Sequence, residues 1–298
     1  MHHRQTEHLH EAAIGLDALP LSGVALILAA AQRDALSVMP DAAEVMASGG
    51  ARMADVIKGG GCLHYAAAGS SGLMAMADAC ELAGTFGIDP AQIRIHMAGG
   101  VPHDATMPGN TEDDSGAAGQ VANTICARDA VILISASGST PYVLEIARHA
   151  RAAGAATICI SNTADAPLLV GADVAVCLPT PPEVLAGSTR MGAGTAQKVA
   201  LNIMSTVMGV ALGHVHNGMM VNVRADNAKL RARAVGIVSA IANVDEGDAT
   251  RCLGIAGGGV KAAILLASGA SDLNEATARL ARSDGHIRAA LAEMKRRT

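Results

Sequence analysis

The stretch CLHYAAAGSSG, residues 62–72, decides the fold, because a short apolar run passes directly into a turn of glycine and serine. Three glycines, Gly59 to Gly61, break the chain just before this run. An apolar run of this length between glycines predicts a buried strand that ends at Gly69. We therefore expect the turn at Gly69 to Gly72 to stand at the carboxyl end of a strand, with a helix starting after Gly72.

The same pattern recurs along the chain. Further apolar runs, separated by Ala-rich stretches of helical length, occupy residues 93–97, 130–134, 156–160 and 174–178. Strands that alternate with helices predict a parallel sheet with helices on both faces, which is an α/β fold. Helical spacing of apolar residues also predicts two helices before the first strand, broken at Pro40-Asp41, and a long helix over about 194–212.

The carboxyl-terminal part has a different pattern. Beyond Asn227 it predicts several short helices and no strand, and we assign the apolar run Ala263 to Leu266 to a helix because its flanks are helical. We divide the chain into amino-terminal helices (1–58), an α/β domain (59–234) and a small helical module (235–298). A chain of 298 residues is long enough to bury a full-sized core without disulfides or a metal.

The composition excludes several classes of function. With no Trp, two Tyr and one Phe, and a net charge of -5, the chain has neither stacking platforms nor a basic surface for nucleic acid. The polar amino terminus lacks the apolar stretch of a signal peptide, and the longest apolar runs fall short of the roughly 20 residues that span a bilayer. We expect a cytoplasmic protein with no membrane contact, whose six cysteines are mostly buried, reduced thiols.

Four hydroxyl- and glycine-rich turns form the candidate ligand site: residues 69–72, 135–140, 187–190 and 192–195. Ligands of parallel α/β sheets bind beyond the carboxyl ends of the strands, where glycine lets the backbone approach a phosphate and hydroxyls donate to it. Each turn alone is more readily a helix cap or a structural turn, but their repetition favours phosphate binding. Neither a P-loop nor a G-x-G-x-x-G motif after the first strand is present, so a monophosphate on a small polyol fits better than a nucleotide.

Two carboxylates are candidates for catalysis. Glu81 is predicted about two and a half turns into the helix after Gly72, and Glu112 lies in an irregular stretch before the next helix. Paired carboxylates in one cleft supply a general acid and a general base. The alternatives are an exposed helix position for Glu81 and, for Glu112 to Asp114, negative charge at a helix N-terminus.

Other chemistry finds less support in the pattern. The eleven His residues show no metal-ligand spacing such as H-E-x-x-H, so no metal site is expected. No G-x-S-x-G motif accompanies Ser137 or Ser188, which are better interpreted as ligand-binding hydroxyls than as nucleophiles.

These segments resemble the sugar isomerase (SIS) fold proteins and, within them, the N-acetylmuramic acid 6-phosphate etherases. The most specific segments are GSSGLMAMADACELAGTFG (69–87), TEDDS (111–115), SASGSTPYV (135–143) and EVLAGSTRMGAGTAQK (183–198). The resemblance implies a SIS-type, flavodoxin-like three-layer fold with a small carboxyl-terminal helical module. It also implies a phosphosugar ligand, a homodimer with the active site near the interface, and no cofactor.

The resemblance implies a lyase reaction. Etherases of this family cleave the D-lactyl ether of N-acetylmuramic acid 6-phosphate to N-acetylglucosamine 6-phosphate and D-lactate, by elimination and hydration, in peptidoglycan and amino-sugar recycling. Glu81 matches the acid that protonates the leaving lactate, and Glu112 matches the second catalytic glutamate, to which we assign removal of the C2 proton. The sugar phosphate would be held by Ser70, Ser71, Ser137, Ser139, Thr140, Ser188 and Thr189.

Three positions depart from the family pattern. Leu73 and Ser139 stand where family members usually carry Arg, and Gly109 stands where an acidic residue is expected. Loss of two cations and a carboxylate near a ligand changes what the site recognises. Two alternatives on the same fold therefore stay open: a regulator that binds a phosphosugar without converting it, and an aldose–ketose isomerase.

Overall fold

The computed structural model describes residues 8–107 and 109–296. A five-stranded parallel sheet has the order β2-β1-β3-β4-β5. Its strands are β1 (Leu63–Ala67), β2 (Ile93–Met97), β3 (Ala130–Ile134), β4 (Ala156–Ser161) and β5 (Val174–Cys177). This is the flavodoxin-like order, so the predicted parallel α/β fold is confirmed, and the predicted strand positions agree closely with the observed ones.

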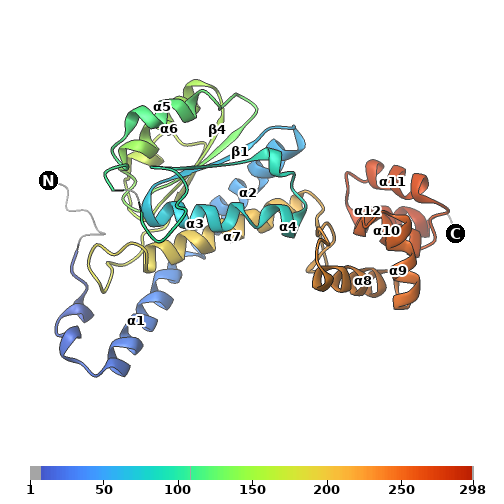
Figure 1. The fold of residues 1–298 in the computed structure, drawn as a ribbon, viewed down its shortest axis with the longest axis horizontal. Helices are drawn as coiled ribbons and strands as arrows, with labels where there is room; N and C mark the ends of the chain where they lie inside the picture. The colour runs from blue at the N-terminus through green and yellow to red at the C-terminus, as the bar shows by residue number, and fades with distance from the viewer. Residues whose placement is uncertain (1–7, 108, 297–298) are drawn as a thin grey trace. The chain divides into compact units, whose positions relative to one another are not determined.

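Helices cover both faces of this sheet (Figure 1). On one face, α5 (Ser115–Ala122) and α6 (Pro141–Ala152) share a buried cluster with side chains of β1 and β3. On the other face lie α2 (Ala43–Lys58), α3 (Gly69–Ala79) and the first part of α7 (Gly192–Ala211). At Gly49 of α2 the packing is so close that a Cβ atom would lie 2.7 Å from Sδ of Met204 in α7. Burial on both faces explains why the central strand β3 is a continuous apolar run, whereas the edge strand β2 is only partly buried and carries Arg94 and His96.

The chain divides into two compact units. One comprises the residues up to Ala79 together with Ala91–Ser205, and the other comprises Cys80–Pro90 together with the residues from Thr206 onward. The second unit holds the end of α7 and the helices α4 (Leu82–Phe86), α8 (Ala228–Ala242), α9 (Glu246–Ile255), α10 (Val260–Ala267), α11 (Leu273–Arg282) and α12 (Ile287–Lys295). The helices predicted beyond Asn227 are thus confirmed, including the assignment of Ala263 to Leu266. The three-part division at 58/59 and 234/235 stays a prediction, since the compact units have other bounds.

A hairpin in the second unit was not predicted. It pairs β6 (Val215–His216) with β7 (Met219–Met220), and the turn between them has positive φ angles at Asn217 (49°) and Gly218 (77°). Asn-Gly with both residues in the left-handed region is typical of a type I′ hairpin turn. The signal was therefore in the sequence, but each strand is only two residues long.

The amino-terminal helix α1 (Leu21–Ala35) presents apolar side chains to the surface. Leu21 is 87% exposed and Leu26 is 73% exposed. Residues Leu21–Val38 have a mean hydropathy of 1.3, and only 6% of them are buried. In the described part of the chain, only this helical segment meets the length and hydropathy criteria for crossing a membrane. Signal sequences and core helices of soluble proteins meet the same criteria, so this finding by itself assigns no membrane span.

The remaining regular structure consists of 3₁₀ turns at Glu11–Ala13, Leu16–Ala18, Leu36–Val38, Pro90–Gln92 and Pro167–Leu169.

The start of β1 is held against the start of β3. A Cβ atom on Gly61 would lie 2.0 Å from the backbone oxygen of Arg128, and the Asp129 carboxylate accepts hydrogen bonds from the N–H groups of Cys62 and Cys126, both at 2.8 Å. The glycine before β1 is therefore required by a close backbone approach, in addition to ending the preceding helix.

We expect Gly61→Ala to lower the free energy of unfolding by about 1–3 kcal/mol, because the added methyl group forces β1 away from the segment before β3. Gly119→Ala in α5 is the matched control: its Cβ meets nothing within 4 Å, and alanine is the better helix former. The midpoints of urea unfolding measure both effects. Equal midpoints for the two variants would contradict the importance of this contact.

Candidate active site

A cavity of about 270 Å³ opens at the carboxyl ends of β1 and β3. In the flavodoxin-like strand order, the chain leaves β1 toward β2 on one side and leaves β3 toward β4 on the other, and ligands bind in the crevice that this creates. Six of the nine predicted site residues line the cavity: Ser70, Ser71, Glu112, Ser137, Thr140 and Thr189. Four larger cavities in the described part of the chain, of about 280, 390, 460 and 770 Å³, contain none of the nine.

The turn after β1 forms one wall of the cavity. Gly69 has a φ of 53°, a left-handed conformation that favours glycine, and α3 begins at this residue rather than after Gly72 as predicted. The first N–H groups of a helix have no intrahelical acceptor and lie at the positive end of its dipole. The N-terminus of α3, with the hydroxyls of Ser70 and Ser71, is therefore suited to an anion.

The turn between β3 and α6 forms the opposite wall and is ordered by its own hydroxyls. The Ser135 hydroxyl lies 2.8 Å from that of Thr140 and accepts a hydrogen bond from the N–H of Gly138. Ser139 donates to the Ser137 hydroxyl from both its N–H (3.3 Å) and its own hydroxyl (3.1 Å). Ser139 thus contacts a lining residue but does not itself line the cavity. Ser135 does line the cavity; it is not among the residues predicted to hold the sugar phosphate, although it belongs to the same SASGST segment.

The two turns before and at the start of α7 behave differently. Gly187 and Thr189 line the cavity, whereas Ser188 does not. The turn at 192–195 was expected to bind ligand, but the buried carboxylate of Glu183 occupies its N–H groups, accepting from Gly192 at 2.9 Å and Ala193 at 2.8 Å. For this turn the structural interpretation holds, because Glu183 caps the helix.

Glu112 faces the cavity, and its neighbour Asp114 performs the capping that was the alternative role for this acidic segment. Asp114 accepts a hydrogen bond from the N–H of Ala117 at the start of α5. A Cβ atom on Gly69 would lie only 2.9 Å from Oε1 of Glu112. The backbone oxygen of Glu112 accepts a hydrogen bond from the N–H of Tyr142. The start of α6 therefore holds the backbone of Glu112, and glycine at position 69 leaves room for its carboxylate.

The predicted position of Glu81 within a helix is wrong. The helix α3 ends at Ala79, and the exposed Glu81 stands in the turn before α4, in the second compact unit. The reason lies in packing: α4 buries Leu82 and Phe86, and the Phe86 ring fills the space beside Gly209, where a Cβ atom would lie 2.5 Å from it.

The buried acid on α3 is Asp78, which we had not predicted. It accepts hydrogen bonds, each 3.0 Å long, from the Tyr65 hydroxyl, the Asn202 amide and the Ser205 hydroxyl. Burial raises the pKa of Asp78, an effect that these hydrogen bonds partly offset, and burial raises the pKa of Tyr65 well above its usual value. This network joins β1, α3 and α7.

The fold and the cavity define a class: this is a SIS-domain protein, and residues 28–162 match the family model described as a SIS domain. The chain is 39% identical to an N-acetylmuramic acid 6-phosphate etherase of Deinococcus radiodurans, over 97% of this chain and 96% of the relative. It is 42% identical to one of Streptomyces avermitilis (82% and 79%) and 37% identical to one of Burkholderia lata (99% and 97%). The chain belongs to the N-acetylmuramic acid 6-phosphate etherase family, as the resemblance of its motifs predicted.

We expect Asp78 to give a measurable pH dependence of stability. Because its folded pKa is above its unfolded pKa, its stabilising contribution is present below the unfolded value and is lost as the pH rises through the folded value. Asp78→Asn removes this titration, so the parent should gain stability relative to the variant as the pH falls from 7 toward 4. Urea unfolding of both proteins at each pH measures the difference, and a constant difference would contradict the raised pKa.

Proposed function

We propose that this protein cleaves the D-lactyl ether of N-acetylmuramic acid 6-phosphate, giving N-acetylglucosamine 6-phosphate and D-lactate. The observation that carries the proposal is Glu112 at a cavity lined with hydroxyls, in a chain that matches an etherase of that specificity over nearly its whole length. The reaction is that of a carbon–oxygen lyase followed by hydration.

The walls of the cavity suit the phosphate of the substrate. Hydroxyls of Ser70, Ser71, Ser137, Thr140 and Thr189 supply donors from three turns. The start of α3 adds backbone N–H groups and the positive end of a helix dipole. Among the residues that the structure describes, no lysine or arginine lines this cavity, so the donors that they offer there are neutral.

Two carboxylates and one water molecule account for the proton transfers and the hydration in the proposed reaction. In the open-chain sugar the C1 aldehyde acidifies the proton on C2, and Glu112 removes it as general base. The C3–O bond then breaks, the electron pair leaves with the lactate oxygen, and Glu81 donates the proton that this oxygen needs. Water adds to the resulting C2–C3 alkene and restores the C3 hydroxyl. The role of Glu81 rests on the motif it shares with the family, whereas that of Glu112 also has the support of its position.

A second candidate is a regulator that binds a phosphosugar and does not convert it. It is favoured by Leu73, Gly109 and Ser139, which replace charged residues of the family pattern. Ser139 influences the cavity through a lining residue, because it donates two hydrogen bonds to the Ser137 hydroxyl.

The finer setting is also part of the proposal. We place the protein in the cytoplasm, without nucleic-acid or membrane partners, as a homodimer with its active site near the interface. The exposed apolar residues Leu21 and Leu26 on α1 support association with a second chain.

We expect Glu81→Gln and Glu112→Gln each to lower the rate of D-lactate release by about 10²–10⁴-fold, because each removes a proton-transferring group while keeping the side-chain shape. Asp113→Asn is the matched control: it removes an exposed negative charge beside Glu112 and should leave the rate within about twofold of the parent. Enzymatic determination of D-lactate measures the rate, and thermal shift with N-acetylglucosamine 6-phosphate verifies that the variants still bind.

Other outcomes separate the candidates. If the parent releases no D-lactate under conditions in which a known etherase does, the etherase proposal is wrong. Stabilisation by the phosphosugar without turnover would then support the regulator. Deuterium from solvent at C2 with ketose formation, and no leaving group lost, would support an isomerase.

Binding of N-acetylglucosamine 6-phosphate should distinguish lining hydroxyls from neighbouring ones. We expect Ser71→Ala to weaken binding about 10- to 100-fold, the loss of one hydrogen bond to a charged group. Ser188→Ala, in a residue that does not line the cavity, should weaken it less than threefold. Calorimetric titration measures both, and equal losses would contradict the site as we draw it.

A further inference from the structure

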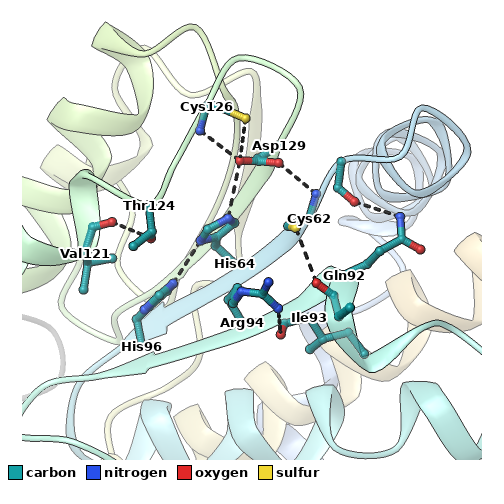
Figure 2. Close-up of polar contacts among 12 residues, drawn as sticks. Cys62, His64, Gln92, Ile93, Arg94, His96, Val121, Thr124, Cys126 and Asp129 are labelled. Carbon is teal, nitrogen blue, oxygen red and sulfur yellow. Dashed lines mark hydrogen bonds and ion pairs between the residues drawn. The ribbon is translucent and has the colours of Figure 1, made fainter.

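A second cluster of polar side chains lies at the opposite, amino-terminal edge of the sheet (Figure 2). Cys62 immediately precedes β1 and His64 lies within it, while Asp129 immediately precedes β3. The Sγ of Cys62, a ring nitrogen of His64 and a carboxylate oxygen of Asp129 all lie within 4.8 Å of one another. Thiol, imidazole and carboxylate are the donor set that zinc takes in proteins.

The spacing is close to that of a tetrahedral site. Ligand atoms bound to one zinc ion stand about 3.3–3.8 Å apart, given bond lengths of about 2.0–2.3 Å. Nε2 of His64 lies 3.5 Å from Oδ2 of Asp129. The Cys126 thiol donates a hydrogen bond of 3.1 Å to the same oxygen and helps to orient the carboxylate.

His64 provides an independent indication of a ligand. Its side chain is only 2% exposed, and its Nε2 is a buried atom with no hydrogen-bond partner among the described residues. The 3.5 Å separation from Asp129 is that of an ion pair and is longer than a usual N–H···O hydrogen bond. The other ring nitrogen, Nδ1, lies 2.9 Å from Nε2 of His96. If Nδ1 carries the ring proton and donates a hydrogen bond to Nε2 of His96, the Nε2 lone pair of His64 faces the Asp129 carboxylate. A cation bound between them would be a partner for both groups.

The arrangement is also held in place by contacts of the kind that orient metal ligands. The two oxygens of Asp129 accept from the backbone N–H groups of Cys62 and Cys126, which fixes the carboxylate between the two cysteines. His96 occupies the place of the outer partner that a ligating imidazole takes through its second nitrogen. Burial lowers the pKa of His64, and the positive charge of Arg94, its register partner on β2, is close enough to lower it further.

We propose that Cys62, His64 and Asp129 form a structural site for a zinc ion. The ion would join the start of β1 to the start of β3. The active-site cavity lies at the other end of these five-residue strands, roughly 15 Å away at about 3.3 Å per residue. The zinc ion therefore stabilises the sheet and takes no part in the proposed reaction.

The test uses the full chain with His2, His3, His8 and His10 replaced by Gln, so that the amino-terminal histidines do not compete for metal. After removal of metals with a chelator, titration with Zn²⁺ against a chromophoric competitor should show one ion per chain. The ion should raise the thermal midpoint, because it binds the folded state. Co²⁺ in place of Zn²⁺ should give thiolate-to-metal charge-transfer absorption and the intense d–d bands of a tetrahedral site.

Variants assign the ligands. Cys62→Ser and His64→Gln should each weaken Zn²⁺ binding at least 100-fold and remove the tetrahedral Co²⁺ spectrum. His96→Gln should weaken it about 10- to 100-fold, as loss of an outer partner does. Cys80→Ser, which removes an exposed thiol outside the cluster, should bind as the parent does.

Two results would overturn the proposal: less than one-tenth of an equivalent of Zn²⁺ bound by the parent, or parent-like affinity and Co²⁺ spectra in both Cys62→Ser and His64→Gln. Thermal midpoints of the metal-free proteins separate loss of binding from loss of folding. The conservative exchange at Cys62, which is not fully buried, keeps the ligand test informative if His64→Gln fails to fold.

Discussion

The parallel pairing of β1 with β2 on one side and β3 on the other is the constraint on which the rest of this structure depends. Its register places the ends of β1 and β3 side by side, at Ala67 and Ile134, while the connections that follow the two strands run in opposite directions across the sheet. The crevice at this point cannot be filled by either connection. Backbone hydrogen bonding, rather than any side chain, therefore decides where the hydroxyl-rich turns meet.

Buried carboxylates then hold the surrounding elements without occupying the cavity. Asp129 ties the starts of β1 and β3 together, Asp78 joins β1 to α3 and α7, and Glu183 caps α7. Each accepts at least two hydrogen bonds, as a carboxylate removed from water requires. Glu112 differs from these three because its side chain faces the cavity, with its backbone held by the start of α6. Of these four carboxylates, three organise the protein and Glu112 lines the cavity.

Strands and turns were predictable from adjacent residues, whereas several positions were not. The sequence placed β3 at its observed bounds because a strand buried on both faces is an uninterrupted apolar run, and it placed the partly buried edge strand β2 at its bounds through the apolar residues Ile93, Ile95 and Met97. It could not place Glu81, because the end of α3 depends on where Leu82 and Phe86 find their packing partners. Ser188 and Thr189 are equivalent in pattern, and only the path of the segment before α7 brings Thr189 to the cavity.

The sequence by itself determined the α/β class, the family, the turn residues that surround the site and the acidic segment that contains Glu112, since these depend on local composition and on motifs of neighbouring residues. Tertiary structure alone decided which strands are neighbours, which hydroxyls share a cavity, and that Cys62, His64 and Asp129 converge. The physical reason is that strand pairing is non-local. Residues far apart in the chain become neighbours only when the backbone hydrogen bonds of the sheet have formed.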